Sequence, residues 1–215
     1  CGPGNSTFAL KQRFPGATIL GIDNSENMIE NAKSAHPDLL FRFQEVDSRF
    51  QTDSNYDLIF SNACIHWIPN HAELIPNMLN ALNPGGTLAI QIPKPWNMPM
   101  YQILGRLQQQ PEWTKIRGVR NFHARQPEEY YDLLTAHAAE FAMWETAYIQ
   151  TMDGIEGIVE WYRGSGLRPY LAALTAPEQE KLLAVLREEL AEFYPLRTNG
   201  KVMMRFPRLF FTAKR

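Results

Sequence analysis

The residues with the clearest chemistry stand at the start of the chain, in the segment Cys1-Gly2-Pro3-Gly4-Asn5-Ser6-Thr7. Its two glycines let the backbone turn tightly and approach a ligand closely, because neither carries a Cβ. One of the three polar residues that follow can cap a helix, and the free N–H groups at the start of that helix would face an anionic group such as a carboxylate. The segment therefore predicts a loop that binds part of a small ligand.

An acidic residue follows the first apolar run after this loop. Ile19-Leu20-Gly21-Ile22 has the pattern of a buried strand and ends in Asp23, about 20 residues beyond the loop, where a carboxylate accepts hydrogen bonds from both ribose hydroxyls. Gly-x-Gly loops also begin ordinary helices, and an Asp after a strand is often a helix cap, so the pair by itself also fits a structural role. A dinucleotide loop has Gly or Ala where this chain has Thr7, so a nucleoside with an amino-acid tail fits better than a pyrophosphate.

Length and composition favour a small molecule as the ligand. A chain of 215 residues, 45% hydrophobic and 20% charged, can bury one sizeable core with a small appended lid. The formal charge is −2 and the sequence has no long basic run, so nucleic acid is not expected as a partner. Two cysteines, Cys1 and Cys64, form neither a disulfide framework nor a multi-ligand metal site. No stretch approaches the roughly 20 apolar residues of a membrane span, and a cytoplasmic protein without a metal is expected.

Strand-like runs alternate with amphipathic helices along the chain. The runs cover residues 17–22, 39–46, 56–62, 87–92, 142–150 and 201–212. The alternation predicts an α/β fold with a largely parallel sheet and a ligand crevice outside the carboxyl ends of the strands. The glycine loop, Asp23, Asp47 and the segment Asn62 to Trp67 would lie along that edge. Within the last run, Pro207 predicts a bulge or an edge strand.

Two helical segments separate the last two strands. They are Ile155 to Arg163 and a longer helix that opens with the capping-box spacing of Thr175-Ala176-Pro177-Glu178. Because they interrupt the sheet, we expect them to form a lid over the crevice. The predicted domains are therefore a ligand-binding α/β domain of residues 1–152 and 201–215, and a helical lid or substrate insertion of residues 153–200.

An ordered set of motifs resembles the class I S-adenosylmethionine-dependent methyltransferases. The motifs are Cys1-Gly2-Pro3-Gly4, Ile22-Asp23, Val46-Asp47, Phe60-Ser61-Asn62 and Leu82-Asn83-Pro84-Gly85-Gly86. Over its full length the chain is similar to trans-aconitate methyltransferases, most distinctively at residues 164–171 (GSGLRPYL) and 205–214 (RFPRLFFTAK). The resemblance implies a Rossmann-like, seven-stranded sheet with an antiparallel last strand, whose first strand would lie upstream of Cys1 in the middle of the sheet.

The resemblance also implies S-adenosylmethionine as the cofactor. Asp23 would bind the ribose diol, Asp47 the adenine amino group and the backbone carbonyl of Asn62 the methionine ammonium. This is sound chemistry, because an amino donor pairs with a carboxylate and a cationic ammonium pairs with carbonyl oxygens. With the loop glycines and flanking residues, the predicted cofactor-binding residues are Gly2, Gly4, Asp23, Asn24, Met28, Asp47, Ser48 and Asn62.

Methylation of a carboxylate needs alignment rather than a general base, since a group with a pKa of about 4 is ionised at neutral pH. We therefore expect arginines and hydrogen-bond donors at the crevice and no catalytic acid–base residue. Arg168 is the first choice for a carboxylate clamp, against the alternative of a solvated arginine at a helix start. Arg208 would either reach the site or pair with an acid in the sheet. The predicted substrate-binding residues are His66, Trp67, Trp96, Arg168 and Tyr170, with packing as the alternative role for the aromatic ones.

The sequence therefore predicts an S-adenosylmethionine-dependent O-methyltransferase acting on a small polycarboxylic acid, with trans-aconitate as the leading candidate. One alternative is a carboxyl methyltransferase for a substrate bound to an acyl carrier protein, which would require a basic docking patch that is not evident. Another is a regulator that binds the cofactor without catalysis. A nicotinamide dehydrogenase is disfavoured by Thr7.

Overall fold

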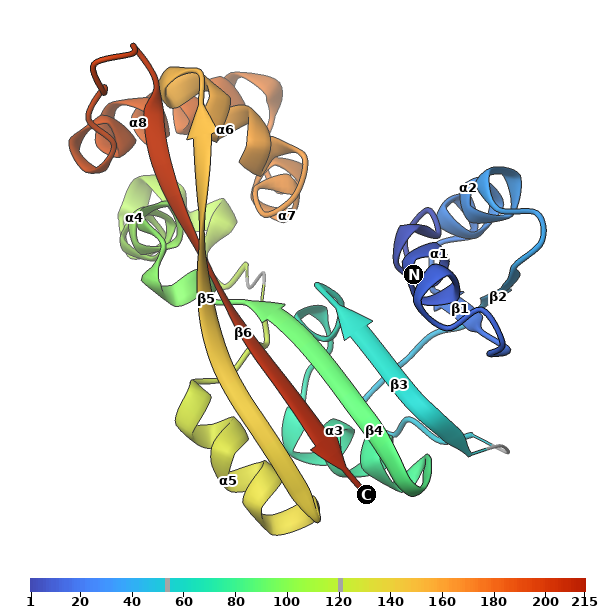
Figure 1. The fold of residues 1–215 in the computed structure, drawn as a ribbon. Helices are drawn as coiled ribbons and strands as arrows, with labels where there is room; N and C mark the ends of the chain where they lie inside the picture. Colours follow the sequence, from blue (N-terminus) through green and yellow to red (C-terminus); the bar gives the residue numbers. More distant parts are fainter. Residues whose placement is uncertain (53–54, 120–121) are drawn as a thin grey trace. The chain divides into compact units, whose positions relative to one another are not determined.

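The computed structural model describes residues 1–52, 55–119 and 122–215. The described residues form six strands and eight α-helices (Figure 1). By contacts, the chain divides into two compact units. Unit 1 contains residues 1–90, 125–142 and 211–215, and unit 2 contains residues 91–124 and 143–210. Among the residues described, no helix is both long and apolar enough to cross a membrane.

The strands form two sheets. In the first, β1 (Leu20–Asp23) pairs in parallel with β2 (Leu40–Phe43), with Leu20 opposite Leu40. The second has the order β3-β4-β6-β5 and contains β3 (Tyr56–Asn62), β4 (Leu82–Pro93), β5 (Glu140–Met152) and β6 (Val202–Lys214). β6 runs antiparallel to its two neighbours, β4 and β5 (Figure 1). The expected α/β class, six strands and antiparallel last strand are confirmed. Among the described strands, β1 has a partner on one side only, and so does β3.

Helices cover the small sheet in unit 1. α1 (Asn5–Arg13) precedes β1, and α2 (Glu26–Ala35) connects β1 to β2. Ile29, Ala32 and Phe41 form the local core between α2 and β2. Further along the chain, unit 1 also contains α3 (His71–Asn80) and α5 (Pro127–His137).

The start of α2 has a side-chain cap, whereas the start of α1 does not. The Ser25 hydroxyl accepts a hydrogen bond from the Met28 N–H at 3.4 Å and caps α2. α1 has no side-chain cap, so the prediction that Asn5, Ser6 or Thr7 caps it is wrong. The capping position is held by Gly4 in a left-handed conformation, with φ of 94°. Thr7 is buried instead, and its hydroxyl would lie 2.6 Å from a Cβ on Gly21.

Several strand boundaries differ from those expected. β2 ends at Phe43, so Asp47 lies four residues beyond the strand. β4 begins at Leu82 and includes residues 83–86, which lie before the expected strand-like run of residues 87–92. They stay in the sheet because the Gly85 N–H donates to the Arg215 carbonyl and the Arg215 N–H donates to the Gly86 carbonyl. A Cβ on Gly86 would lie 2.9 Å from the Tyr56 carbonyl oxygen, so only glycine allows this close approach.

Unit 2 has a helical core. α4 (Pro99–Leu107), α6 (Gly154–Arg163), α7 (Arg168–Ala172) and α8 (Ala176–Phe193) contribute buried side chains to one apolar cluster. The predicted insertion of residues 153–200 thus consists of α6, α7 and α8. α4 was not predicted, because the preceding proline-rich segment suggested irregular structure. Pro99 is instead the first residue of α4, a position that needs no backbone N–H.

β6 changes face at Pro207. Val202, Met204 and Phe206 are buried before it, whereas Leu209, Phe211 and Ala213 are buried after it, so the inward-facing positions shift from even to odd numbers. One extra residue in the strand has this effect, as in a bulge. Of the two predictions for Pro207, the bulge fits this pattern. The edge strand is wrong, because β6 lies between β4 and β5.

The capping box at the start of α8 allows a prediction about stability. Glu178 accepts hydrogen bonds from Lys115 at 2.7 Å and from the Thr175 N–H at 2.8 Å, and these bonds lower its pKa to about 2. Its contribution is therefore complete above the usual value of 4.5 and lost as the pH falls through about 2. We expect Glu178→Gln to lower the melting temperature at pH 7 and to match wild type below pH 2.

Thermal unfolding followed by circular dichroism at several pH values measures this effect. Glu180→Gln is the matched control, since Glu180 is exposed on the same helix. The effect should shrink in high salt, because the ion pair with Lys115 is exposed. An equal loss for both variants at pH 7 would contradict the assigned role of the capping box.

Candidate active site

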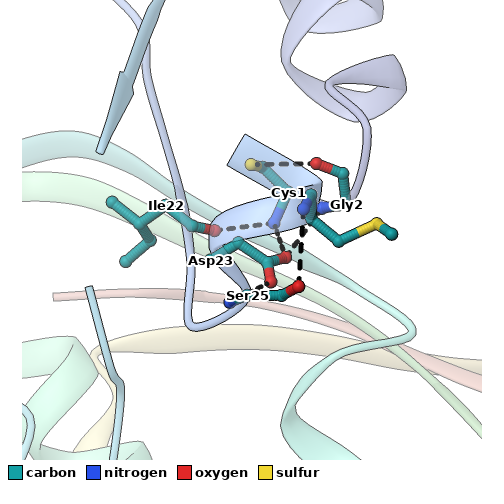
Figure 2. A network of polar contacts seen from close by, with 6 residues as sticks. Cys1, Gly2, Ile22, Asp23 and Ser25 are labelled. Carbon is teal, nitrogen blue, oxygen red and sulfur yellow. Dashed lines mark hydrogen bonds and ion pairs between the residues drawn. The ribbon is translucent and has the colours of Figure 1, made fainter. Parts of the chain in front are cut away.

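Asp23 holds the glycine loop against the end of β1. Its Oδ2 accepts hydrogen bonds from the Gly2 N–H at 2.8 Å and from the Cys1 amino group at 3.1 Å. Its Oδ1 accepts one from the Ser25 N–H at 3.1 Å. The Cys1 amino group also donates to the Ile22 carbonyl at 2.7 Å (Figure 2). One carboxylate thus links the loop, the strand and the start of α2.

The charge of Asp23 follows from these contacts. Burial alone would raise the pKa of this carboxyl, but the hydrogen bonds from the Gly2 N–H, the Cys1 nitrogen and the Ser25 N–H outweigh it and lower the pKa below the usual 3.8. Asp23 is therefore ionised at neutral pH. A carboxylate has about four lone-pair positions, so it retains acceptor capacity beyond the three bonds in this structure.

The two loop glycines have different roles. A Cβ on Gly2 would meet no atom within 4 Å, so this residue borders open space. A Cβ on Gly4 would lie 2.8 Å from the His36 ring and 3.1 Å from the Phe41 ring, so glycine is required there for packing. Both residues have positive φ, 55° and 94°. Open space of the kind that a ligand can use is therefore found at Gly2.

The residues after β2 are bound to other parts of unit 1. Asp47 accepts hydrogen bonds from Arg49, which lower its pKa, and its side chain is 47% exposed. The Ser48 hydroxyl donates to Glu73 at 2.8 Å, and the Ser48 carbonyl accepts from Asn77 at 2.8 Å. Asp47 thus remains a solvent-accessible acceptor, whereas the described contacts tie Ser48 to α3. The prediction that Asp47 stands at the carboxyl end of a strand is wrong, because β2 ends at Phe43.

A cavity of about 330 Å³ lies between α1 and the end of β3. Its lining residues are Asn5, Ser6, Ala9, Leu10, Phe60 and Asn62. Of the predicted cofactor-binding residues, Asn62 alone belongs to this lining; Asn24 is exposed and Met28 half-buried. Asn5 and Ser6 belong to the segment that the sequence analysis predicted to bind a ligand. Ala9 and Leu10 were missed, although their spacing places them on the same face of the helix.

The chain turns sharply after Asn62. Ala63 has φ of 49°, a left-handed conformation that is strained for a residue with a Cβ and that is often found at functional sites. The following 3-10 helix, η1 (Ile65–Trp67), carries two predicted substrate residues. His66 is buried with its ring 4.7 Å from the Trp67 ring, and Trp67 is 45% exposed. Trp67 thus presents a surface to solvent, whereas His66 is packed.

A buried histidine fixes η1 in place. His71, in α3, has its Nε2 2.8 Å from the Ile65 carbonyl and its Nδ1 2.5 Å from the Tyr130 hydroxyl. Because a carbonyl only accepts, Nε2 carries the proton and Nδ1 accepts from Tyr130. The Tyr130 oxygen in turn accepts from the Arg125 N–H at 3.2 Å. The sequence analysis missed His71, since nothing local indicates a partner 59 residues away.

The other predicted substrate residues belong to unit 2. Arg168 is the exposed first residue of α7, and Trp96 is half-buried in η2 (Pro95–Asn97). Tyr170 is 5% exposed in the helical core, and burial raises the pKa of its hydroxyl. Packing, the alternative kept for Tyr170, fits this burial. Arg168 has the exposure that either a substrate clamp or a solvated arginine would show.

The residues of unit 1 fit S-adenosylmethionine in the groups that they present. Ionised Asp23 and accessible Asp47 are acceptors for ribose hydroxyls and an adenine amino group. The backbone at Gly2 leaves room for an amino-acid tail, because a side chain there would point into open space. Gly4, in contrast, serves packing.

Comparisons with known proteins point to the same class. A family model described as a methyltransferase domain matches residues 1–153. The trans-aconitate 2-methyltransferases of Shigella dysenteriae and Escherichia coli O157:H7 are 41% identical over 219 residues, a match that covers 100% of this chain and 84% of each relative.

Solved structures share the fold at low identity. The YcgJ protein from Bacillus subtilis is 16% identical, with a TM-score of 0.63 over 100% of this chain and 88% of its own. Phosphoethanolamine N-methyltransferase 2 of Haemonchus contortus, in complex with S-adenosyl-L-methionine, is also 16% identical, with a TM-score of 0.55 over 99% of this chain and 46% of its own. Together with the family model and the closer relatives, they show that the chain belongs to the methyltransferase family that includes the trans-aconitate 2-methyltransferases.

Proposed function

We propose that this protein transfers a methyl group from S-adenosylmethionine to a carboxylate of a small polycarboxylic acid, and that trans-aconitate is its substrate. The observation that carries the proposal is the 41% identity, over the whole chain, to relatives named trans-aconitate 2-methyltransferase. A cytoplasmic location and the lack of a nucleic-acid partner remain predictions from the sequence.

The proposed cofactor contacts lie in unit 1. Asp23 accepts hydrogen bonds from the ribose hydroxyls, Asp47 accepts one from the adenine amino group and the Asn62 carbonyl faces the methionine ammonium. When bound, S-adenosylmethionine supplies an electrophilic sulfonium methyl group. The flanking contacts are assigned to Gly2, Gly4, Asn24, Met28 and Ser48.

The remaining task of the chain is to orient the substrate. A carboxylate is already ionised at neutral pH, so no residue has to remove a proton. The protein must hold one carboxylate oxygen in line with the methyl group, exclude water and neutralise the other carboxylates. We assign these roles to Arg168 as a clamp, to Trp67 and Trp96 as apolar walls, and to His66 as a donor. For Tyr170 we keep the packing role that its burial fits.

Replacing Arg168 by Ala should raise the KM for trans-aconitate about 10- to 100-fold, because a charge-assisted contact with a carboxylate is lost. The Kd for S-adenosylhomocysteine should stay nearly constant. Steady-state kinetics and calorimetry measure the two quantities. Arg163→Ala is the control, since Arg163 is exposed and pairs with Glu160. A higher Kd for S-adenosylhomocysteine together with an unchanged KM for trans-aconitate would show that Arg168 does not bind the substrate.

The proposed function is tested by methyl transfer from labelled S-adenosylmethionine to a panel of acids. The panel contains trans-aconitate, cis-aconitate, citrate, isocitrate and fatty acids, and cofactor binding is confirmed first. Transfer to trans-aconitate well above the others is the expected result. If the cofactor binds but no acid is methylated, the assignment of trans-aconitate as the substrate is wrong, and the carrier-protein or regulator alternatives are favoured.

A further inference from the structure

Among the residues that the structure describes, Arg208 of unit 2 has no charged partner. Its Nη1 donates to the Oε1 of Gln91 at 2.7 Å, which is a neutral amide oxygen. By contrast, Arg106, Arg163 and Arg187 of the same unit each pair with a glutamate. The sequence analysis left open whether Arg208 pairs with an acid in the sheet. Within the described residues it does not, because its described partners are an amide and two aromatic rings.

Two hydrogen-bond donors of this pair, one on Arg208 and one on Gln91, have no acceptor among the described residues. In the described part of the chain, neither the Nε of Arg208 nor the Nε2 of Gln91 has a hydrogen-bond partner, and both atoms are shielded from solvent. Gln91 is 3% exposed. Its amide orientation is fixed, since only its oxygen can accept from the guanidinium. Native proteins rarely leave two neighbouring buried donors unsatisfied, so the arrangement calls for an acceptor from outside.

The guanidinium also lies close to two aromatic rings. Its Cζ lies 4.6 Å from the centre of the Phe206 ring and 5.6 Å from the centre of the Tyr148 ring. Burial lowers the pKa of Arg208, which expresses the cost of keeping an uncompensated charge there. Arginine remains charged under these conditions and presents a planar fork that matches a carboxylate. Tyr148 is 44% exposed, so its side chain is the one that can turn aside to admit a ligand.

The position in the sheet is one where ligands bind. Gln91 is two residues from the carboxyl end of β4, and ligands of α/β sheets bind outside the carboxyl ends of strands. Arg208 lies in the antiparallel neighbour β6, directly after Pro207, where the strand changes face. With this change of face, Arg208 donates a hydrogen bond to Gln91 on the neighbouring strand.

From this geometry we infer that Arg208 and Gln91 form a carboxylate-binding site for the acidic substrate. The inference rests on the proposed function, which supplies a substrate with several carboxylates. The bound carboxylate accepts hydrogen bonds from the Nε of Arg208 and from the Nε2 of Gln91 and compensates the charge of the guanidinium. Arg208 is thus a second substrate-binding arginine, in addition to Arg168.

The first test compares Arg208→Met with Arg205→Ala. Arg208→Met should raise the KM for trans-aconitate about 10- to 100-fold, as expected for the loss of hydrogen bonds to a charged group. Its Kd for S-adenosylhomocysteine should stay constant. Arg205→Ala is the matched control, because Arg205 is exposed on the same strand, and it should behave as wild type. An unchanged KM for Arg208→Met overturns the inference.

Gln91→Glu separates substrate binding from a purely structural role. The carboxylate introduced at position 91 would form an ion pair with the Arg208 guanidinium and so block the proposed substrate-binding site. We expect the KM to rise about tenfold or more while the melting temperature stays equal or increases, since an unpaired buried charge gains a partner. A stabilised variant with an unchanged KM would show that Arg208 acts in the fold alone and would overturn the inference.

Calorimetry with trans-aconitate and citrate, in the presence of S-adenosylhomocysteine, distinguishes this inference from the proposed function. If wild type binds these acids and Arg208→Met does not, the result supports the carboxylate-binding site. If no methyl is transferred to them as well, the proposed function is wrong while the site stands. Equal binding by both proteins, or binding by neither, overturns the site whatever the outcome of the activity assay.

Discussion

Asp23→Ala is expected to weaken S-adenosylmethionine binding about 100-fold or more. The carboxylate is proposed to accept a hydrogen bond from each ribose hydroxyl, and charge-assisted bonds contribute about 1.5–3 kcal/mol each. In the structure it also accepts from the N–H groups of Gly2 and Ser25. The substitution therefore removes both a ligand contact and the group that holds the loop in place.

A second variant separates these two effects. Asp23→Asn keeps an oxygen that can accept from one N–H group but has no charge, so it should retain more thermal stability than Asp23→Ala and still bind the cofactor weakly. Asp38→Ala is the control, because Asp38 is an exposed acid in the turn before β2. Calorimetry with S-adenosylhomocysteine gives the affinities, and circular dichroism gives the melting temperatures. Unchanged affinity in Asp23→Ala would remove Asp23 from the cofactor site.

The same carboxylate predicts a pH dependence. The pKa of Asp23 is lowered in the folded protein, so its contribution to stability is complete above the usual value of 3.8 and is lost as the pH falls through the lowered folded value. The stability difference between wild type and Asp23→Asn should therefore be constant near neutral pH and shrink in acid. A difference that grows below pH 3.8 would contradict this assignment.

Gly166→Ala is expected to destabilise unit 2 by about 2–3 kcal/mol, as overpacking of a buried site does. A Cβ at this position would lie 1.9 Å from the Tyr101 hydroxyl oxygen and 3.0 Å from the ring carbon that carries it. Tyr101 has little room to move, because its ring packs edge-on against Phe122 at 5.0 Å and Tyr162 at 5.6 Å. The turn that leads to Arg168 must therefore shift, and substrate affinity should fall with stability.

Gly164→Ala is the matched control two residues earlier. Its Cβ would lie 3.7 Å from the Trp161 carbonyl, an ordinary contact, and the residue has a right-handed helical conformation. This change should be neutral or slightly stabilising. Tyr101→Phe removes the hydroxyl that causes the closest contact, so Gly166→Ala combined with Tyr101→Phe should recover part of the lost stability. Chemical denaturation measures wild type, Gly164→Ala, Gly166→Ala, Tyr101→Phe and the double variant. Additive effects in the double variant would show that Tyr101 does not cause the loss.

Local patterns in the sequence were enough to locate the six strands and to indicate the protein class, although α4 was missed. Six apolar runs became six strands, and the capping box of α8 formed where its spacing indicated. Such signals are readable because the hydrogen bonds of a cap join residues three positions apart. The motifs around Asp23 and Asn62 likewise gave the methyltransferase class before any contact was known.

Contacts between distant residues were decided by the tertiary structure. The glycines at 85 and 86 stay in β4 because they pair with Arg215, and Gly166 is required because Tyr101 packs against it. The partner of Arg208 is an amide 117 residues away. The sequence by itself determined which elements form and which residues carry suitable chemistry, since both depend on near neighbours. Only the folded chain decided which side chains meet, because packing joins residues that no local pattern connects.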